Sequence, residues 1–105
     1  MYREQDFDIA RNIKAVEWLK TELVLNAGQV CRALLTAKDE IAVQSLANIM
    51  MSSYLLAKRL GVSYSKLEDV VQRRAVAAQN EGHELEQWYR DLSALAEHLD
   101  ARKSV

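Results

Sequence analysis

The amino-acid sequence predicts an all-α protein, a bundle of four helices. Its 105 residues contain no proline and are dominated by Ala, Leu, Glu, Lys, Arg and Gln, which lose little entropy on entering a helix. Apolar residues also recur at steps of three and four, as they do on one face of a helix. Because a chain of this length suits one hydrophobic core, we predict a single helical domain over residues 1–105.

The first predicted helix begins at Asp6 or Asp8, either of which can cap it, and ends near Leu34. Gly28 falls in mid-helix, where glycine costs roughly 1 kcal/mol relative to alanine. A break or kink between Leu19 and Gly28 is therefore an alternative to one continuous helix. One apolar face runs along this segment, through Ile9, Ile13, Val16, Leu23, Val30 and Leu34.

The second predicted helix runs from Glu40 to Leu60, with Asp39 as its cap and Gly61 as a left-handed stop. The short link before it predicts antiparallel packing on the first helix. This second helix is apolar on most sides, so we expect neighbours to cover it nearly all round. Its large apolar residues are Leu46, Ile49, Met50, Tyr54, Leu55 and Leu56.

Two further helices complete the predicted bundle. The third opens at Ser63 or at Ser65, which has capping-box spacing to Glu68, and ends near Gly82. The fourth runs from Glu84 to about Arg102 as one amphipathic helix, with Glu86 and Arg90 pairing one turn apart. Its apolar stripe is Leu85, Trp88, Leu92, Leu95 and Leu99.

Charge and composition exclude several classes of partner. The net charge of -1 offers no field to attract nucleic acid. The longest uncharged run, Ile41 to Ala57, is too short and too polar to span a bilayer, and the first residues resemble neither a signal nor a transit peptide. We therefore expect a cytoplasmic protein, with Cys31, the single cysteine, as a small buried hydrophobe.

Two stripes of polar residues run along the first and second predicted helices. Antiparallel packing would bring the stripes together, and buried amides and hydroxyls are tolerated only when they are hydrogen-bonded. The simplest interpretation is a polar layer that sets the register of the two helices. The stripes are Glu22, Asn26 and Gln29 on the first helix, and Gln44, Ser45, Asn48 and Ser52 on the second.

Several stretches resemble one known family over nearly the whole chain. They are LNAGQVCRALL at residues 25–35, SLANI at 45–49, AKRLGV at 57–62, GHELE at 82–86 and DLS at 91–93. This pattern is similar to the MazG family of the all-α nucleoside triphosphate pyrophosphohydrolase superfamily, and more closely to the short MazG-like proteins. The resemblance implies an all-α fold that assembles as a dimer or tetramer, and a nucleotide as a candidate ligand.

The resemblance also places the family's metal site in this chain. Catalytic members carry three glutamates and a Glu-x-x-Asp motif that bind Mg²⁺, which bridges the phosphates while water attacks and pyrophosphate leaves. Here the matching positions hold only uncharged side chains, and Mg²⁺ is held chiefly by anionic oxygen. We therefore predict no metal, no cofactor and no catalytic residues, and interpret these positions as a degenerate metal site: Leu25, Asn26, Gln29, Ser45 and Asn48.

Two alternatives accompany this prediction of a non-catalytic binding or interaction module. An active pyrophosphohydrolase would need Mg²⁺ at a relocated site, and a purely structural oligomerisation partner would bind no nucleotide. The resemblance makes Arg73 and Arg74 candidate phosphate contacts, whereas His83 and His98 are too isolated to form a metal pair. Carboxylates that could build a relocated site are Glu17, Glu22, Asp39, Glu40, Glu68 and Asp69.

Overall fold

The computed structural model describes residues 4–103, with side chains from residue 7 onward. Within these residues it contains five α-helices and no strand, which confirms the all-α fold class. The chain divides into two compact units, Met1–Val62 and Ser63–Val105, and each is described by itself below. The assignment of all 105 residues to a single domain stays a prediction.

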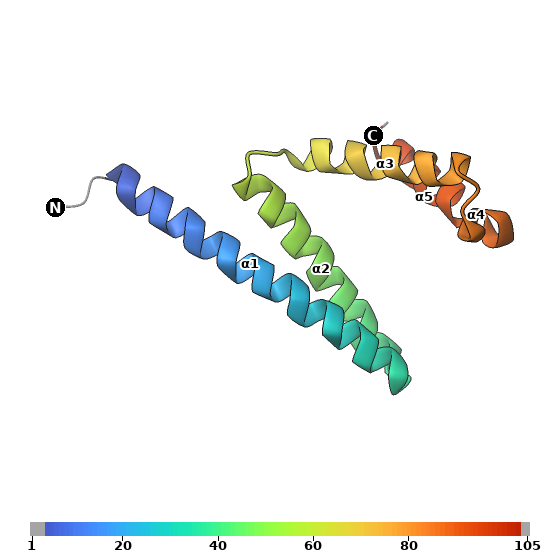
Figure 1. Cartoon of the computed structure of the whole chain (residues 1–105), viewed down its shortest axis with the longest axis horizontal. Coiled ribbons are helices and arrows are strands. Elements are labelled where there is room, and N and C mark those ends of the chain that lie inside the picture. Colours follow the sequence, from blue (N-terminus) through green and yellow to red (C-terminus); the bar gives the residue numbers. More distant parts are fainter. Residues whose placement is uncertain (1–3, 104–105) are drawn as a thin grey trace. The chain divides into compact units, whose positions relative to one another are not determined.

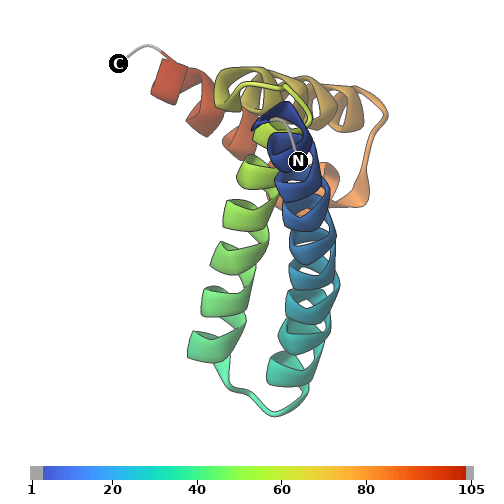
Figure 2. The same ribbon diagram turned by 90° about the vertical axis from the view of Figure 1, so that its left-hand side faces the viewer.

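The first unit is an antiparallel hairpin of two long helices, α1 (Glu4–Leu35) and α2 (Asp39–Arg59), which lie side by side (Figures 1 and 2). α1 continues without interruption through Gly28, so the alternative of a break in this helix is wrong. It also begins before Asp6 and Asp8, so neither aspartate stands at its N-cap. Packing against α2 offsets the intrinsic cost of one mid-helix glycine.

The turn of the hairpin occupies residues 36–38 and closes on the last turn of α1. The Lys38 amide donates to the Ala33 carbonyl over 2.9 Å, and Ala37 adopts a left-handed conformation with a φ of 54°. Lys38 is the N-cap of α2 and makes no capping hydrogen bond with its side chain. The predicted cap, Asp39, instead lies inside the first turn, where its negative charge suits the helix dipole.

α1 and α2 pack along a seam of alternating three- and four-residue steps, in which many side chains are small. On α2 this seam is formed by Ala42, Ser45, Ile49, Ser52 and Leu56, of which the alanine and both serines are buried. Small side chains at the contact let the two helix backbones approach closely. On α1 the seam is formed by Leu19, Leu23, Asn26, Val30 and Ala33, all buried or half-buried.

Most of the burial on α2 lies along this seam, and Ala57, near the end of the helix, is the one other buried residue of α2. Leu46 and Met50, on another side of the helix, are 50% and 59% exposed. The expectation that neighbours cover α2 nearly all round is therefore not met within one chain. Large apolar side chains therefore remain exposed on this helix.

The second unit contains α3 (Tyr64–Asn80), α4 (Glu84–Tyr89) and α5 (Asp91–Lys103), with α3 packed against α5. Ser63 caps α3, because its hydroxyl accepts a hydrogen bond from the Lys66 amide over 3.1 Å. Of the two predicted caps, Ser63 is therefore correct and Ser65 is wrong. Gly61 and Gly82 adopt left-handed conformations, with φ of 84° and 76°, as their predicted helix-ending positions require.

The predicted last helix is broken in two at Arg90, which has a φ of 58°. Glu86 does not remain on the outside of one continuous helix. Its carboxylate accepts hydrogen bonds from the Ser93 amide, over 2.9 Å, and from the Ser93 hydroxyl. The first of these bonds satisfies one backbone amide in the first turn of α5, and together they hold the pKa of Glu86 below its usual range.

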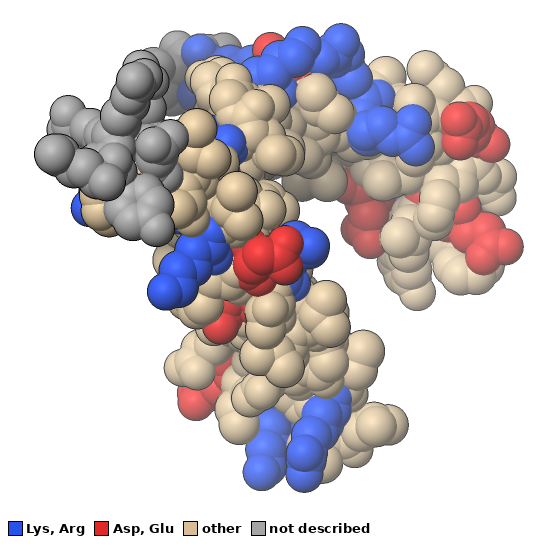
Figure 3. All heavy atoms as spheres, turned by 60° about the vertical axis from the view of Figure 1, so that its left-hand side comes forward, with Lys and Arg blue, Asp and Glu red and all other residues tan. Residues whose placement is uncertain are grey.

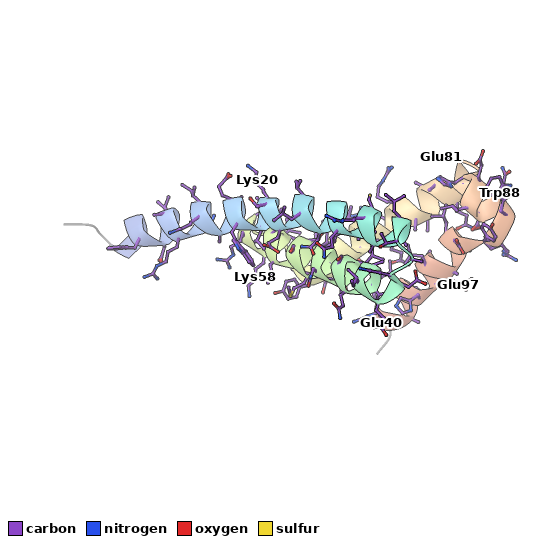
Figure 4. All side chains as sticks on the ribbon, turned by 90° about the horizontal axis from the view of Figure 1, so that it is seen from below. Lys20, Glu40, Lys58, Glu81, Trp88 and Glu97 are labelled. Atoms are coloured by element: carbon purple, nitrogen blue, oxygen red, sulfur yellow. The ribbon has the colours of Figure 1, made fainter. Side chains whose placement is uncertain are left out.

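The break also leaves the predicted apolar stripe incompletely covered. Trp88 projects from α4 and is 65% exposed (Figure 4), and Leu95 on α5 is 42% exposed. The residues buried on α5 are Ser93 and Ala96. The amphipathic pattern correctly predicted helical conformation in this segment, but it did not predict which side chains become buried.

Candidate functional site: the polar layer of the helical hairpin

The two polar stripes meet at a pair of asparagines. Asn48 of α2 donates from its side-chain amide to the side-chain oxygen of Asn26 on α1, over 3.2 Å. Asn26 in turn donates to Glu22, to the main-chain oxygen over 2.8 Å and to the carboxylate over 3.4 Å. The predicted contact between the stripes is confirmed here, and we call Glu22, Asn26, Ser45, Asn48 and Ser52 the polar layer.

The hydroxyls of the polar layer lie deeper in the seam than its amides. Ser45 and Ser52 are only 3% and 2% exposed, whereas Asn26 is half-buried and Asn48 is exposed. Among the described residues, no buried side-chain nitrogen or oxygen lacks a hydrogen-bond partner. The buried polar groups are therefore compatible with a stable helix contact.

The five positions that the family resemblance predicts to be a degenerate metal site do not all converge. The structure brings Asn26 and Asn48 into direct contact and buries Ser45 in the seam beside them. Gln29 lies one turn from Asn26 toward the hairpin turn and is exposed. Leu25 is 61% exposed and offers no polar group. A ligand at this face would therefore contact the exposed amides before the buried Ser45 hydroxyl.

These side chains do not fit a magnesium ion. Each of the five positions holds a neutral group, and amide or hydroxyl oxygens alone offset the dehydration of Mg²⁺ poorly. Glu22 adds one carboxylate, and its Oε2 already accepts a hydrogen bond from Asn26. Across residues 7–103, no three His, Cys, Asp or Glu side chains lie together as a metal site would need. This donor set therefore supports no metal-dependent step.

A cavity of about 350 Å³ adjoins the polar layer at the turn end of the hairpin. Sequence reasoning included Gln29 among the site positions but missed the two cations of the cavity, Arg32 and Lys38. No motif marked them, because basic residues near the end of a helix are common complements of its dipole. The lining consists of Gln29, Arg32, Ala33, Thr36, Lys38 and Ile41.

The candidate phosphate contacts, Arg73 and Arg74, belong to the second unit, where both are exposed on α3. In Figure 3 Lys and Arg side chains gather along one edge of the second unit, which contains α3 and the basic end of α5. Asp69 lies one turn before Arg73 on α3. Its ion pair with Lys103, together with the charge of Arg73, lowers its pKa.

The structure corrects the predicted burial of Cys31 and gives His83 a capping role. Cys31 is exposed, so its prediction as a small buried hydrophobe is wrong: its position on α1 lies just beside the packed seam. His83 is the N-cap of α4, and its Nδ1 accepts a hydrogen bond from the Leu85 amide over 3.1 Å. Neither residue belongs to the polar layer.

The fold and the site together define a class of protein: an all-α protein in which two antiparallel helices pack along a seam of small side chains and are joined by a hydrogen bond between two side-chain amides. The family model described as the MazG-like family matches residues 9–92, and the chain belongs to this family. The matched residues include the whole polar layer and the cavity beside it. No curated protein and no solved structure matches the chain. None of the described helices is long and apolar enough to cross a membrane.

Proposed function

We propose that this member of the MazG-like family binds a nucleotide-related ligand at the polar layer and does not hydrolyse it. The observation that carries the proposal is the hydrogen bond between Asn26 and Asn48. By the family resemblance, both residues stand at positions where catalytic members hold metal-binding carboxylates. In this chain the two side chains bind each other across the hairpin.

The chemistry of amides supports binding rather than catalysis. A carboxamide offers both donors and an acceptor, so it can recognise the polar edges of a base or sugar. It does not supply the charge that holds Mg²⁺, and without a metal there is no Lewis acid for the phosphoryl oxygens and no means of acidifying the attacking water. Ligand recognition can therefore persist where hydrolysis is lost.

The direct experiment measures pyrophosphate release from each common nucleoside triphosphate in the presence of Mg²⁺ or Mn²⁺. We expect no release above that of a buffer control. Release that disappears on Asn26→Ala or Asn48→Ala substitution would establish the alternative, an active pyrophosphohydrolase, and refute this proposal.

A restoration variant tests the correspondence with the metal site. Asn26→Glu, Gln29→Glu, Ser45→Glu and Asn48→Asp should together create Mg²⁺ binding that is measurable by calorimetry. Because Ser45 is almost fully buried, a second variant without the Ser45→Glu change guards against misfolding.

A matched control for restoration adds four carboxylates at exposed positions outside the polar layer. The control changes are Ala10→Glu, Thr21→Glu, Ala27→Glu and Ala47→Glu. We expect no gain of Mg²⁺ affinity from this variant. Equal gains in the restoration and control variants would show that added charge alone attracts the metal.

We also propose that the chain forms a homo-oligomer, a dimer or tetramer, because α2 carries an uncovered apolar stripe. Val43, Leu46 and Met50 follow one another at steps of three and four, and each is at least half exposed. Contiguous apolar surface of this kind is typical of protein interfaces.

The purely structural alternative, an oligomerisation partner without a ligand, would be excluded by saturable nucleotide binding in calorimetry.

A further inference from the structure

The cavity at the turn end of the hairpin shares one edge of α1 with the polar layer. Glu22, Leu25, Gln29 and Arg32 follow one another on this edge at steps of three and four. The first of them hydrogen-bonds within the polar layer, and the last two line the cavity. A ligand held at Asn26 and Asn48 can therefore extend along this edge into the cavity.

Positive charge predominates in the cavity lining. Arg32, in the last turn of α1, and Lys38, at the N-cap of α2, are its two charged residues. The acidic residues of the first turn of α2, Asp39 and Glu40, line a different hollow together with Val43 and Gln44. The carboxylate of the polar layer, on Glu22, lies ten residues before Arg32, about 15 Å along the helix and beyond a Debye length at physiological salt.

Neutral donors complete the lining. Gln29 contributes a side-chain amide. Ile41 lies in the first turn of α2, where the N-cap residue makes no side-chain hydrogen bond to the backbone amides. Thr36 contributes a hydroxyl, which donates to the carbonyls of Arg32 and Ala33 over 3.3 Å each and leaves its own oxygen able to accept. A guanidinium, an ammonium and an amide around one hollow match the acceptor oxygens of a phosphate group.

We propose that this cavity binds a phosphate-class anion without a metal ion, with Arg32 and Lys38 supplying the charge. The inference deepens the proposed function and rests on it for the ligand class, since it assigns the anionic end of a nucleotide-related ligand to the cavity. Neutral residues at the degenerate metal site favour this binding, because carboxylates there would repel a metal-free phosphate. The two cations of the lining take the place of the ion.

The test uses inorganic pyrophosphate as the probe, titrated into the full chain by calorimetry in the presence of a chelator. We expect saturable binding, weakened at least about tenfold by the Arg32→Gln, Lys38→Gln double variant, because two charge-assisted contacts are lost. NMR spectra of the wild type should show shifts at the Gln29 side-chain amide and the Ile41 backbone amide on addition of pyrophosphate.

The control for this test is a Lys20→Gln, Arg59→Gln double variant, which removes the same charge from exposed positions of the same hairpin. Its affinity for pyrophosphate should match that of the wild type, and circular dichroism should show that both double variants are folded. Absence of pyrophosphate binding would overturn the inference, as would equal weakening in the control. Loss of binding on Arg73→Gln, Arg74→Gln substitution instead would place the anion on α3.

The outcomes of this test separate a failure of the anion site from a failure of the proposed function. Pyrophosphate binding at Arg32 and Lys38 together with release of pyrophosphate from nucleotides would refute the non-catalytic proposal and leave the anion site in place. Nucleotide binding that does not change when Arg32 and Lys38 are substituted would refute the anion site and leave the proposed nucleotide binding in place. The two proposals therefore fail in distinguishable ways.

Discussion

Single residues determine how closely the two helices of the hairpin approach. Ser45 and Ser52 are the most deeply buried polar residues of the described chain, and they share the α2 seam with Ala42. Serine is small enough for close packing, and among the described residues no buried side-chain oxygen lacks a hydrogen-bond partner. The two serines thus allow tight packing and also place polar groups in the seam. The amides of Asn26 and Asn48 add further polar groups closer to the surface.

Enlarging a seam residue should destabilise the hairpin. Ser52→Leu adds a branched side chain at a position that is 2% exposed, and overpacking of this kind costs about 1–3 kcal/mol. The free energy of unfolding, measured by urea denaturation, should fall by that amount. Ala47→Leu, at an exposed position of the same helix, is the control and should change stability little. Equal effects of the two substitutions would contradict the close-packed seam.

At the scale of elements, the junction between α4 and α5 combines an unfavourable backbone conformation at Arg90 with favourable hydrogen bonds to the carboxylate of Glu86. Arg90 has a φ of 58°, which is costly for a residue with a Cβ. The two hydrogen bonds that Glu86 accepts from Ser93 help to offset that cost. A continuous helix would remove the strain at Arg90 but would separate Glu86 from the amide of Ser93.

Glycine at the junction should stabilise the second unit. Arg90→Gly removes the Cβ from a left-handed residue, and we expect a gain of up to about 1 kcal/mol, reduced by the greater entropy of the unfolded chain. Arg90→Ala is the control, since it removes the charge but keeps the Cβ. Thermal unfolding of the two variants separates the effect of the backbone from that of the side chain, and a Gly variant no more stable than the Ala variant would contradict the strain.

Acid should weaken the same junction. The folded-state pKa of Glu86 lies below its usual value of 4.5, so its stabilising effect is complete above that value and is lost as the pH falls through the lowered pKa. We expect the thermal stability of the wild type to approach that of Glu86→Gln between neutral pH and about pH 3. A difference between the two proteins that stays constant over this range would contradict the role of the carboxylate. Asp69, whose pKa is also lowered, is present in both proteins and does not affect the comparison.

At the scale of the whole molecule, the apolar stripe of α2 predicts association between chains. Leu46→Glu or Met50→Glu places a charge on the stripe and should shift the protein to a monomer in size-exclusion chromatography with light scattering. Gln44→Glu, at an exposed position of the same helix outside the stripe, should leave the oligomer intact. A wild type that is monomeric at all concentrations would refute self-association.

Local signals in the sequence predicted most of the helices and several of their ends. Gly61, Gly82 and Ser63 act through their own backbone conformation or over three residues, so pattern and position are enough to identify them. The all-α class follows from the same local preferences, and the polar stripes on the first two helices follow from helical spacing. The sequence by itself therefore determined the fold class and the faces of the hairpin that carry polar residues.

Contacts between residues distant in sequence or in different elements decided the rest. The break at Arg90 depends on Glu86 reaching Ser93 around a turn, and the meeting of Asn26 with Asn48 depends on the exact antiparallel register of two helices. The cavity around Arg32 and Lys38 forms only where the hairpin closes. Helical spacing predicts which face of a helix a side chain occupies. Which other side chain it contacts is decided only by the tertiary structure, because packing sets both register and burial.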